Sequence, residues 1–514
     1  MGQMVVDNGG QRGTNTPMAY LLPFDLTIRG GAVVYPSSPP LLLSNLFINT
    51  GGSLTCLPAL SNLDVAVLRN ATIDADGAIS VDGKGFGLGS GPGAGIGGPT
   101  HSYVGSGAGY GGNGGASSVS PGGVTYGSAQ QPVDRGSGGG YGSGGASGGS
   151  EGGGAIRLTV GGVLTVNGQL SAGGDAALED DAGGGSGGSI WLAAGALAGN
   201  GAIAADGGAG ELYNGGGGGG GRIALYAPVN AFAGQVSAAG ASGVFPGQNG
   251  SIYSASTPPA LQVVSTTPAG AVNSGVSSFD ILFSAAVNPA SVSAATVALT
   301  APGGVAVSNL AVSTISAYLF RVSFLQQIAQ GDYILTVGPQ VLDLLGQPMS
   351  QVYTGAFSIV WSAVQGAVTD TNGLPVAGVV LQPDNGIPST TTDTNGLYLL
   401  SVPPNMTIHV TPSAPGLMFV PSSRSYVNVT AAISNKNYLA VSTIAPAVAM
   451  QVQTNTCVLS WYGLSGVSYQ PLYSTNLVDW LPYNSALPGT NGAMQLLLPM
   501  DTNPIMFFRV GASD

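Results

Sequence analysis

Charged side chains are scarce in this chain, and their scarcity limits its partners. Of the 514 residues, 11 are Lys or Arg and 23 are Asp or Glu, which gives a formal net charge of −12 at pH 7. A groove that follows the phosphates of a nucleic acid needs many Lys and Arg side chains on one surface. We therefore expect no nucleic-acid partner.

Long apolar runs, helical patterns and cysteine pairs are also missing. No stretch of about 18 apolar residues is present, so we expect no membrane-spanning helix. The apolar residues fall instead in short alternating runs rich in Val, Ile, Leu, Thr and Tyr, which is typical of strands. The two cysteines, Cys56 and Cys457, fall in different predicted modules, so we expect no disulfide between them. A chain of this length and pattern is predicted to be all-β and divided into several modules.

Four stretches of the N-terminal half share one pattern: an apolar alternation, a turn that contains a glycine, and a second short alternation. They are VAVLRNATIDADGAISVDGKG from Val65, IRLTVGGVLTVNGQLSAGG from Ile156, IWLAAGALAGNGAIAADGG from Ile190 and IALYAPVNAFAGQVSAAG from Ile223. The turn glycines Gly168, Gly201 and Gly234 follow one another at a spacing of 33 residues. Repetition at such a period predicts copies that stack their apolar positions into one core.

These repeats favour a parallel β-helix or a related β-solenoid over residues 1–257. A truncated fifth copy, NGSIYSAS, begins at Asn249, and the segments FDLTIRGGAVVYP and LLLSNLFINTGGSLTCLP that precede the repeats alternate in the same way. We expect these preceding segments to form the first rungs or a cap, because a stacked array needs a covered end.

Glycine tracts separate the copies, and two interpretations of them are open. The tracts lie at residues 83–115, 136–154, 183–188 and 215–221. In the first interpretation they are flexible surface loops, whose closure entropy rises only slowly with length. In the second they lie side by side in a polyproline-II-like conformation and hydrogen-bond backbone to backbone. The second arrangement requires glycine, because a side chain would prevent the close approach.

Two resemblances follow after Tyr253, where the glycine density falls. Residues 258–360 contain about seven short strand-like runs, as in a β-sandwich. Within them VVSTTPAGAVNSGVSSFDILFSAAVNPASV, GDYILTV and DLLGQPM resemble the Ig-like module of bacterial S-layer and other surface proteins. Residues 361–441 resemble the carboxypeptidase-regulatory-like, transthyretin-like sandwich. The positions that match its pattern are Gly366, Asp370, Gly373, Pro375, Gly378, Asp393, Gly396 and Tyr398.

The last segment, residues 442–514, contains YSTNLVDW and a final aromatic-Arg-Val strand. It is similar to a small C-terminal β-sandwich of large secreted bacterial proteins. Trp461 and Trp480 are expected to be core residues of this sandwich, because a buried aromatic ring contributes a large apolar area.

Side chains that transfer protons are rare. His101, in a glycine tract, and His409, in the run TIHVT, are expected to be a loop residue and an ordinary strand residue. Their spacing does not suit a metal. The strings GASGG at 145–149 and GGSGG at 184–188 have the G-x-S-x-G form, but neither lies between a strand and a helix. We predict no enzyme activity, no catalytic or metal-binding residue and no cofactor.

Acidic residues gather near two of the repeats. They are Asp74, Asp76 and Asp82 in the first copy and Asp175, Glu179, Asp180 and Asp181 after the second. Asx turns beside glycine explain the first group. The second group is a solvated loop or, alternatively, a calcium site with oxygen ligands. The two DTNG sequences at Asp370 and Asp393 indicate type I or I′ turns, with calcium again as the alternative.

Aromatic residues also recur among the glycines. They are Tyr103, Tyr110, Tyr126 and Tyr141. Aromatic rings in such positions stack on sugars or against a neighbouring subunit in one interpretation, and pack against their own solenoid wall in the other.

The modules together predict a non-catalytic, extracellular structural or adhesive protein of a bacterial surface, whose secretory leader is not visible in this sequence. Solenoid ends and the edge strands of sandwiches are sites for assembly into fibres, so self-association or contact with other matrix components is expected. The alternative is a β-helix protein with accessory modules that binds or degrades a polysaccharide. A glycan is therefore a second expected partner.

Overall fold

The computed structural model describes residues 2–13, 15–18, 23–37, 40–57, 61–143, 150–442, 446–453, 456–499 and 506–513. In these residues the helical elements are short 3-10 turns, η1 (Pro99–His101), η3 (Pro289–Ser291) and η4 (Pro302–Gly304), and all other regular structure is β-strand. This agrees with the all-β prediction. No helix in the described part of the chain is long and apolar enough to cross a membrane.

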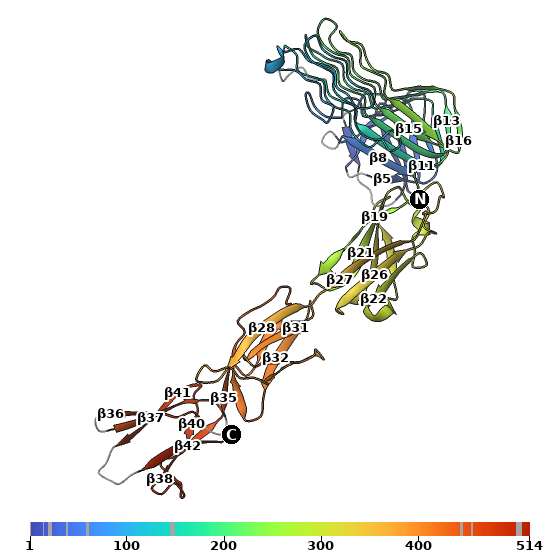
Figure 1. Ribbon diagram of the computed structural model, residues 1–514. Coiled ribbons are helices and arrows are strands. Elements are labelled where there is room, and N and C mark those ends of the chain that lie inside the picture. Colours follow the sequence, from blue (N-terminus) through green and yellow to red (C-terminus); the bar gives the residue numbers. More distant parts are fainter. Residues whose placement is uncertain are drawn as a thin grey trace.

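Two all-parallel sheets make up the N-terminal half, which we call the parallel-sheet region (residues 3–255; Figure 1). The 11-stranded sheet contains β1 (Gln3–Asp7), β3 (Asp25–Arg29), β5 (Leu41–Leu43), β6 (Asn45–Ile48), β8 (Asn62–Val67), β9 (Ala71–Ile73), β11 (Ala155–Val166), β13 (Ser189–Gly199), β15 (Arg222–Tyr226), β16 (Val229–Phe232) and β18 (Ser251–Ala255). The 7-stranded sheet contains β2 (Asn15–Met18), β4 (Val33–Pro36), β7 (Ser53–Leu54), β10 (Ala78–Ser80), β12 (Gln169–Ser171), β14 (Ala202–Ala204) and β17 (Gln235–Ser237).

Equivalent apolar residues of the repeats lie beside one another in these sheets. Ile156 pairs in parallel with Ile190, and Ile190 pairs with Ile223. In the second sheet Leu170 pairs with Ile203. All five side chains are at most 1% exposed and belong to one buried cluster. Since burying one such side chain contributes about 1.5–3 kcal/mol, the alternation seen in the sequence is what holds the copies in register.

The segments around the repeats join the same sheets. The two segments that precede the repeats supply β3, which pairs with β6, and β4, which pairs with β7. The truncated copy supplies β18, which pairs with β15. Parallel pairing of successive copies around a shared core is the arrangement that a stacked array requires.

Two facing sheets follow in residues 263–359. One contains β19 (Val263–Thr267), β21 (Val276–Phe283), β25 (Leu319–Gln327) and β24 (Ala311–Thr314). The other contains β20 (Gly270–Val272), β27 (Tyr353–Ile359), β26 (Gly331–Val337), β22 (Val297–Ala301) and β23 (Val305–Ala306). These nine strands exceed the number expected, because the edge strands β20 and β23 are three and two residues long and leave no alternation in the sequence.

The last two regions are also pairs of sheets. The first pair contains β31 (Leu397–Val402), β28 (Ser362–Thr369), β35 (Tyr438–Ser442) and β33 (Leu417–Val420), and β30 (Thr390–Thr391), β29 (Val380–Pro383), β32 (Thr407–Ser413) and β34 (Arg424–Val427). The second pair contains β36 (Ala449–Gln453), β37 (Thr456–Gly463) and β41 (Gly492–Pro499), and β39 (Leu481–Pro482), β38 (Ser468–Ser474), β40 (Leu487–Pro488) and β42 (Phe507–Ser513).

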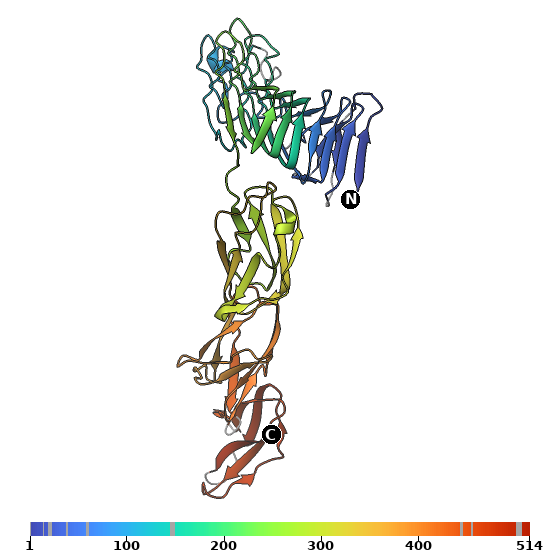
Figure 2. The same ribbon diagram turned by 90° about the vertical axis from the view of Figure 1, so that its right-hand side faces the viewer.

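Each pair of sheets encloses its own cluster of buried apolar side chains. Figure 2 shows the three sandwich-like regions following one another in a line, with the strands of the parallel-sheet region stacked across that line at its far end. The three sandwich-like regions therefore form an extended row, and the parallel-sheet region lies across its end. The contacts between the parallel-sheet region and the first sandwich-like region decide how firmly the two are joined.

Candidate functional site: the glycine bundle, an outer groove and two junctions

The glycine tract 215–221 hydrogen-bonds three neighbouring segments in turn. Each successive N–H group points to a different neighbour, and the pattern returns at every third residue. The donor and acceptor pairs are Gly216 to Gly105 and Gly219 to Ala108, Gly217 to Phe245 and Gly220 to Gln248, and Gly218 to Gly208 and Gly221 to Ala205. A polyproline-II helix has three residues per turn and no internal hydrogen bonds. The period of three is therefore what packed polyproline-II segments produce.

The tract 183–188 follows the same rule. Its pairs are Gly183 to Gly140 and Ser186 to Ser137, Gly184 to Gly216 and Gly187 to Gly219, and Gly185 to Asp175 and Gly188 to Ala172. We call the tracts together with the segments that they contact, residues 83–143, 150–154, 172–188, 205–221 and 238–250, the glycine bundle.

Close approach makes glycine necessary in the bundle. A Cβ atom on Gly217 would lie 2.1 Å from the carbonyl oxygen of Ala241, and one on Gly219 would lie 2.3 Å from that of Gly112. Residues 215–221 are buried throughout. The interpretation of the tracts as flexible loops is therefore wrong for these residues, and the ordered interpretation agrees with the structure. The string at 145–149 lies outside the described residues.

Side chains inside the bundle serve packing. Tyr110 is fully buried, its hydroxyl lies 2.6 Å from the Ser189 hydroxyl, and its ring centroid lies 4.7 Å from that of Tyr126. Burial raises the pKa of Tyr110 to about 12. In the second G-x-S-x-G string, the Ser186 hydroxyl accepts a hydrogen bond from the Ser137 N–H, as a structural group. These tyrosines therefore pack against their own molecule, whereas Tyr103 is 43% exposed.

The outer turns of the bundle expose apolar side chains, which we call the tip patch. Its members are Val119, Leu178, Leu212, Tyr213 and Phe245, each between 52% and 85% exposed. Hydrogen bonds join the turns that carry them: the Asn214 amide donates to Asp181 at 2.6 Å, the Ser118 N–H to the Asn214 carbonyl at 3.2 Å, and the Val244 N–H to the Gly215 carbonyl at 2.8 Å. These exposed apolar side chains on joined turns make the tip patch a candidate contact site.

The acidic residues of the repeats act within the fold. Asp82 accepts hydrogen bonds from the Ser171 hydroxyl and the Gly173 N–H of the next copy, so it links successive copies in addition to forming a turn with Ser80. Asp74 and Asp76 are exposed. In the described part of the chain no group of three or more His, Cys, Asp or Glu side chains is placed to hold a metal ion.

A groove crosses the outer face of the 7-stranded sheet. It has a volume of about 670 Å³ and crosses β4, β7 and β10 and the turns beside them. Its lining includes Ser53 and Ser80 on the strands, Thr55 just after β7, the basic residues Arg12 and Lys84, and the acidic residues Asp76 and Asp82. Such a surface offers hydroxyl and charged groups but no aromatic ring.

The first junction joins the parallel-sheet region to β19–β27. The Tyr318 hydroxyl donates to the Asp64 carboxylate at 2.7 Å. The Arg157 guanidinium lies between the rings of Trp191 and Tyr318, 4.3 and 4.6 Å from their centroids, and donates to the Ser284 carbonyl at 2.6 Å. Burial raises the pKa of Asp64 to about 6, against the opposite effects of the Arg157 charge and the Tyr318 hydrogen bond.

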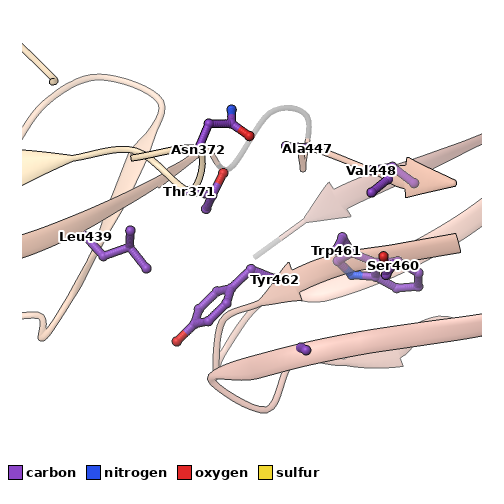
Figure 3. A pocket seen from close by; sticks show the side chains of 10 residues that line it. Thr371, Asn372, Leu439, Ala447, Val448, Ser460, Trp461 and Tyr462 are labelled. Carbon is purple, nitrogen blue, oxygen red and sulfur yellow. The ribbon is translucent and has the colours of Figure 1, made fainter. Parts of the chain in front are cut away.

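The second junction lies between residues 361–441, the third region, and residues 442–514, the C-terminal region. A cavity of about 380 Å³ opens there, lined from one side by Thr371, Asn372 and Leu439 and from the other by residues that include Trp461 and Tyr462 (Figure 3). Trp461 is 4% exposed, and its indole nitrogen has no hydrogen-bond partner among the described residues. The expectation that Trp461 is a core residue is confirmed.

Three other predicted residues have plain roles. Trp480 is only partly buried, and the Arg509 guanidinium covers its ring at 4.3 Å. The core prediction for Trp480 is wrong, because the residue lies outside the strands and its ring is covered by an exposed charged side chain. His409 lies on β32, 2.9 Å from the Asp384 carboxylate at the surface, and His101 contacts Thr100 in η1. Among the described residues neither histidine belongs to a group of three or more possible metal ligands.

The DTNG sequences form turns. Asp370 accepts hydrogen bonds from the N–H groups of Asn372 and Leu374, both at 2.8 Å, and Asp393 accepts the equivalent pair. Gly373 and Gly396 have positive φ, whereas the asparagines before them do not. This excludes the type I′ form, which needs positive φ at both central residues. The backbone explains both carboxylates without calcium.

Comparison with known proteins gives one family match. Residues 255–362 match the model of a bacterial Ig-like domain, in agreement with the resemblance found in the sequence for residues 258–360. No curated protein matches the chain.

Solved structures share low similarity with this chain. The Bacillus anthracis TIE protein is 9% identical over 49% of this chain and 55% of its own, with a TM-score of 0.20. The N-terminal part of the bacterial S-layer protein SbsC is 11% identical over 47% of this chain and 44% of its own, with a TM-score of 0.17. The chain thus spans about half the length of each of these proteins. The group B streptococcus pilus 2b backbone protein is 10% identical over 35% of this chain and 98% of its own, with a TM-score of 0.18. Scores this low do not indicate a common fold over the matched lengths.

Proposed function

We propose that this chain is a non-catalytic structural or adhesive protein of a bacterial surface, in which a β-solenoid head is held across a stalk of β-sandwich modules. In this proposal the third region is the carboxypeptidase-regulatory-like module and the C-terminal region is the sandwich that ends the stalk. The observation that carries the proposal is the first junction, where Tyr318 and Arg157 join head and stalk by buried contacts. A flexible connection between head and stalk would not need these buried contacts. A connection that transmits force needs them, because they hold the head at a fixed angle to the stalk.

The glycine bundle supports a mechanical role. Its segments are joined by backbone hydrogen bonds in three directions, so the bundle resists deformation, whereas the strands of the head enclose an apolar core. The tip patch leaves Leu178, Leu212 and Tyr213 in solvent. Carboxylates flank it at residues 179–181 and 211. We propose that the tip patch makes the contact, either with further copies in a fibre or with other components of the surface.

Microscopy and sedimentation of the full chain test this function. We expect filaments or clusters in negative stain, and their loss when Leu178, Leu212 and Tyr213 are replaced by serine. The matched control replaces Val305 and Leu325, which are 63% and 74% exposed on the Ig-like module; it should assemble as the natural chain does. A chain that stays monomeric at all concentrations and binds no cell-wall material contradicts the proposal.

A second candidate function, polysaccharide binding, is favoured by the groove on the outer face of the 7-stranded sheet. A polymer that lies across the strands would contact Ser53 and Ser80 and then reach Lys84. A glycan array with the natural chain and the Lys84→Ala variant tests it, and Lys436→Ala, which removes the other lysine away from the groove, is the control. Equal binding by both variants, or no binding by the natural chain, excludes the groove as the site.

A further inference from the structure

We propose that the two ends of the parallel-sheet region bind each other in neighbouring copies of this chain, so that the sheets of one copy continue into those of the next. This proposal rests on the structural function proposed above and names a second contact surface, separate from the tip patch. Three observations support it: the core is open at both ends, the two ends are stepped in complementary ways, and both end strands point backbone groups outward.

The core of the parallel-sheet region is open at its two ends. Among the described residues, the apolar side chains that pack against this core while staying partly exposed are Met4, Val6, Phe232 and Val236. Met4 and Val6 lie on β1, and Phe232 and Val236 lie on β16 and β17. Figure 2 shows the first strands (blue) and the last strands (green) at opposite ends of the stack. A further pair of strands at either end would cover this apolar surface.

The two ends are stepped in complementary ways. One column of strands runs from β5 to β18, and its last strand, β18, lies one strand beyond β16 and β17. Ile252 on β18 is 50% exposed, although its neighbour Ile223 is fully buried. At the opposite end β1 and β2 begin before β5. The occupant of the last end must offer parallel strands to both sheets beside this step, and the first end of a second copy does so.

The strand register carries over from copy to copy. One row of paired residues contains Met4, Leu26, Leu46, Ala71, Leu164, Leu197 and Asn230. A row of the second sheet contains Thr16, Val34, Leu54, Ile79, Leu170, Ile203 and Val236. In a stack, Met4 of the next copy follows Asn230, and its Thr16 follows Val236. Each copy adds seven strands to the second sheet, so the axial repeat is about 34 Å at a spacing of about 4.8 Å per strand.

Backbone groups at both ends point outward with the alternation that pairing needs. On β1 the Gly2 carbonyl and the Asn8 N–H are bonded to β3. Because successive residues of a strand face alternate sides, Val5 faces the free edge. On β16 the Ala233 N–H, just after the strand, is bonded to β13, so Asn230 faces the free edge. In the continued register the Val5 N–H of one copy donates to the Asn230 carbonyl of the other.

Two features keep this contact weak. Asn230 ends an otherwise apolar row with a polar side chain. On β2 the Met18 carbonyl accepts from Ser37, so Pro17 faces the free edge, where it has no N–H to donate. We therefore expect the ends alone to form short, reversible oligomers, and the filaments or clusters of the natural chain still require the tip patch.

Sedimentation velocity with the full chain tests the contact, at a salt concentration that screens the repulsion between copies of net charge −12. The tip-patch variant with its three serines isolates the ends, and we expect it to form dimers and short linear oligomers with the axial repeat given above in negative stain. In this background Val5→Pro and Asn230→Pro should each abolish association, because the proline ring replaces an edge-facing N–H.

The matched control is Ala306→Pro on β23, an edge strand of the Ig-like module. Its neighbour Val307 donates to the Leu299 carbonyl of β22, so Ala306 also faces a free edge, far from the proposed contact. This variant should associate as the tip-patch variant does. Proline is tolerated where its position faces solvent on an edge strand, and the unfolding temperature of each variant checks that it folds.

A mixture of the two proline variants gives the sharpest test. The Val5→Pro chain keeps its last end and the Asn230→Pro chain keeps its first end, so an equimolar mixture should form dimers and nothing longer. Proline variants that associate as strongly as Ala306→Pro, or a mixture that stays monomeric, overturn the proposal. If the natural chain assembles and the tip-patch variant stays monomeric at every concentration, the end contact is overturned and the proposed function stands. If both assemble equally, the end contact stands and the tip patch is not the contact.

Discussion

The first junction should weaken as the pH rises. Asp64 lies under Tyr318, and burial raises its pKa from 3.8 to about 6. A carboxyl group whose folded pKa is raised binds its proton more tightly in the docked state than in the unfolded chain. Its contribution to stability is therefore greatest below pH 3.8 and is lost between pH 3.8 and 6. The pKa difference corresponds to about 3 kcal/mol as an upper value.

The variant that isolates this effect is Asp64→Asn. Asparagine keeps an oxygen that accepts from the Tyr318 hydroxyl and cannot ionise, so the junction of the variant should be more stable than the natural one at pH 8 and nearly equal to it at pH 4. The charged group that acts on Asp64 is Arg157. Trp191 stacks on Arg157, so its fluorescence reports the junction during urea unfolding at each pH.

An exposed carboxylate provides the matched control. Asp7 forms an ion pair with Arg29 at 2.8 Å, and the Gly9 N–H and Arg29 lower its pKa. Its contribution to stability has the opposite sign: it is present at neutral pH and lost in acid, so Asp7→Asn should not stabilise the chain at pH 8. If Asp64→Asn destabilises the junction at pH 8, attraction between Asp64 and Arg157 outweighs desolvation, and the reasoning is refuted.

Three further predictions concern the parallel-sheet region and its bundle. Gly219→Ala should lower the stability of the bundle by about 1–3 kcal/mol, because the new Cβ atom would meet a backbone carbonyl. Gly87→Ala is the control, since a Cβ atom there has nothing within 4 Å. Equal rates of backbone hydrogen exchange in the two variants would contradict packed polyproline-II segments. Tyr110→Phe removes the buried hydroxyl that pairs with Ser189 and should lower the free energy of unfolding in urea by about 1–2 kcal/mol. Tyr103→Phe, at an exposed tyrosine, should not change it measurably. Asp82→Ala removes the hydrogen bonds to Ser171 and Gly173 of the next copy. It should lower the unfolding temperature by several degrees, since about 1 kcal/mol corresponds to about 2–4 °C in a domain of this size. An unchanged unfolding temperature shows that these hydrogen bonds are dispensable.

Much of the fold could be predicted because the signals are local. The 33-residue spacing of Gly168 and Gly201 and the alternations around them predicted paired copies, and Ile156, Ile190 and Ile223 pair in that way. The Ig-like module was found from its own motifs and is matched by a family model. The error at Trp480 has a different origin: the size of its ring predicted burial, but the residue lies outside the strands and Arg509 covers the ring.

The candidate sites depended on contacts that no local pattern contains. Asp64 meets Tyr318 across 254 positions of the chain, and Asn372 and Trp461 line one cavity from different regions. The one available signal was the repeated DTNG sequence, which identified the turn but not the cavity beside one copy of it.

The amino-acid sequence by itself determined the strand type, the repeat period and the turns, because side-chain alternation and backbone preference act over a few neighbouring residues. Only the tertiary structure decided whether the glycine tracts are loops or packed segments, because glycine permits both, and the choice depends on carbonyl groups far away in the chain. The same holds for the junctions, where a carboxyl group or an indole N–H acquires its properties from whatever the fold brings beside it.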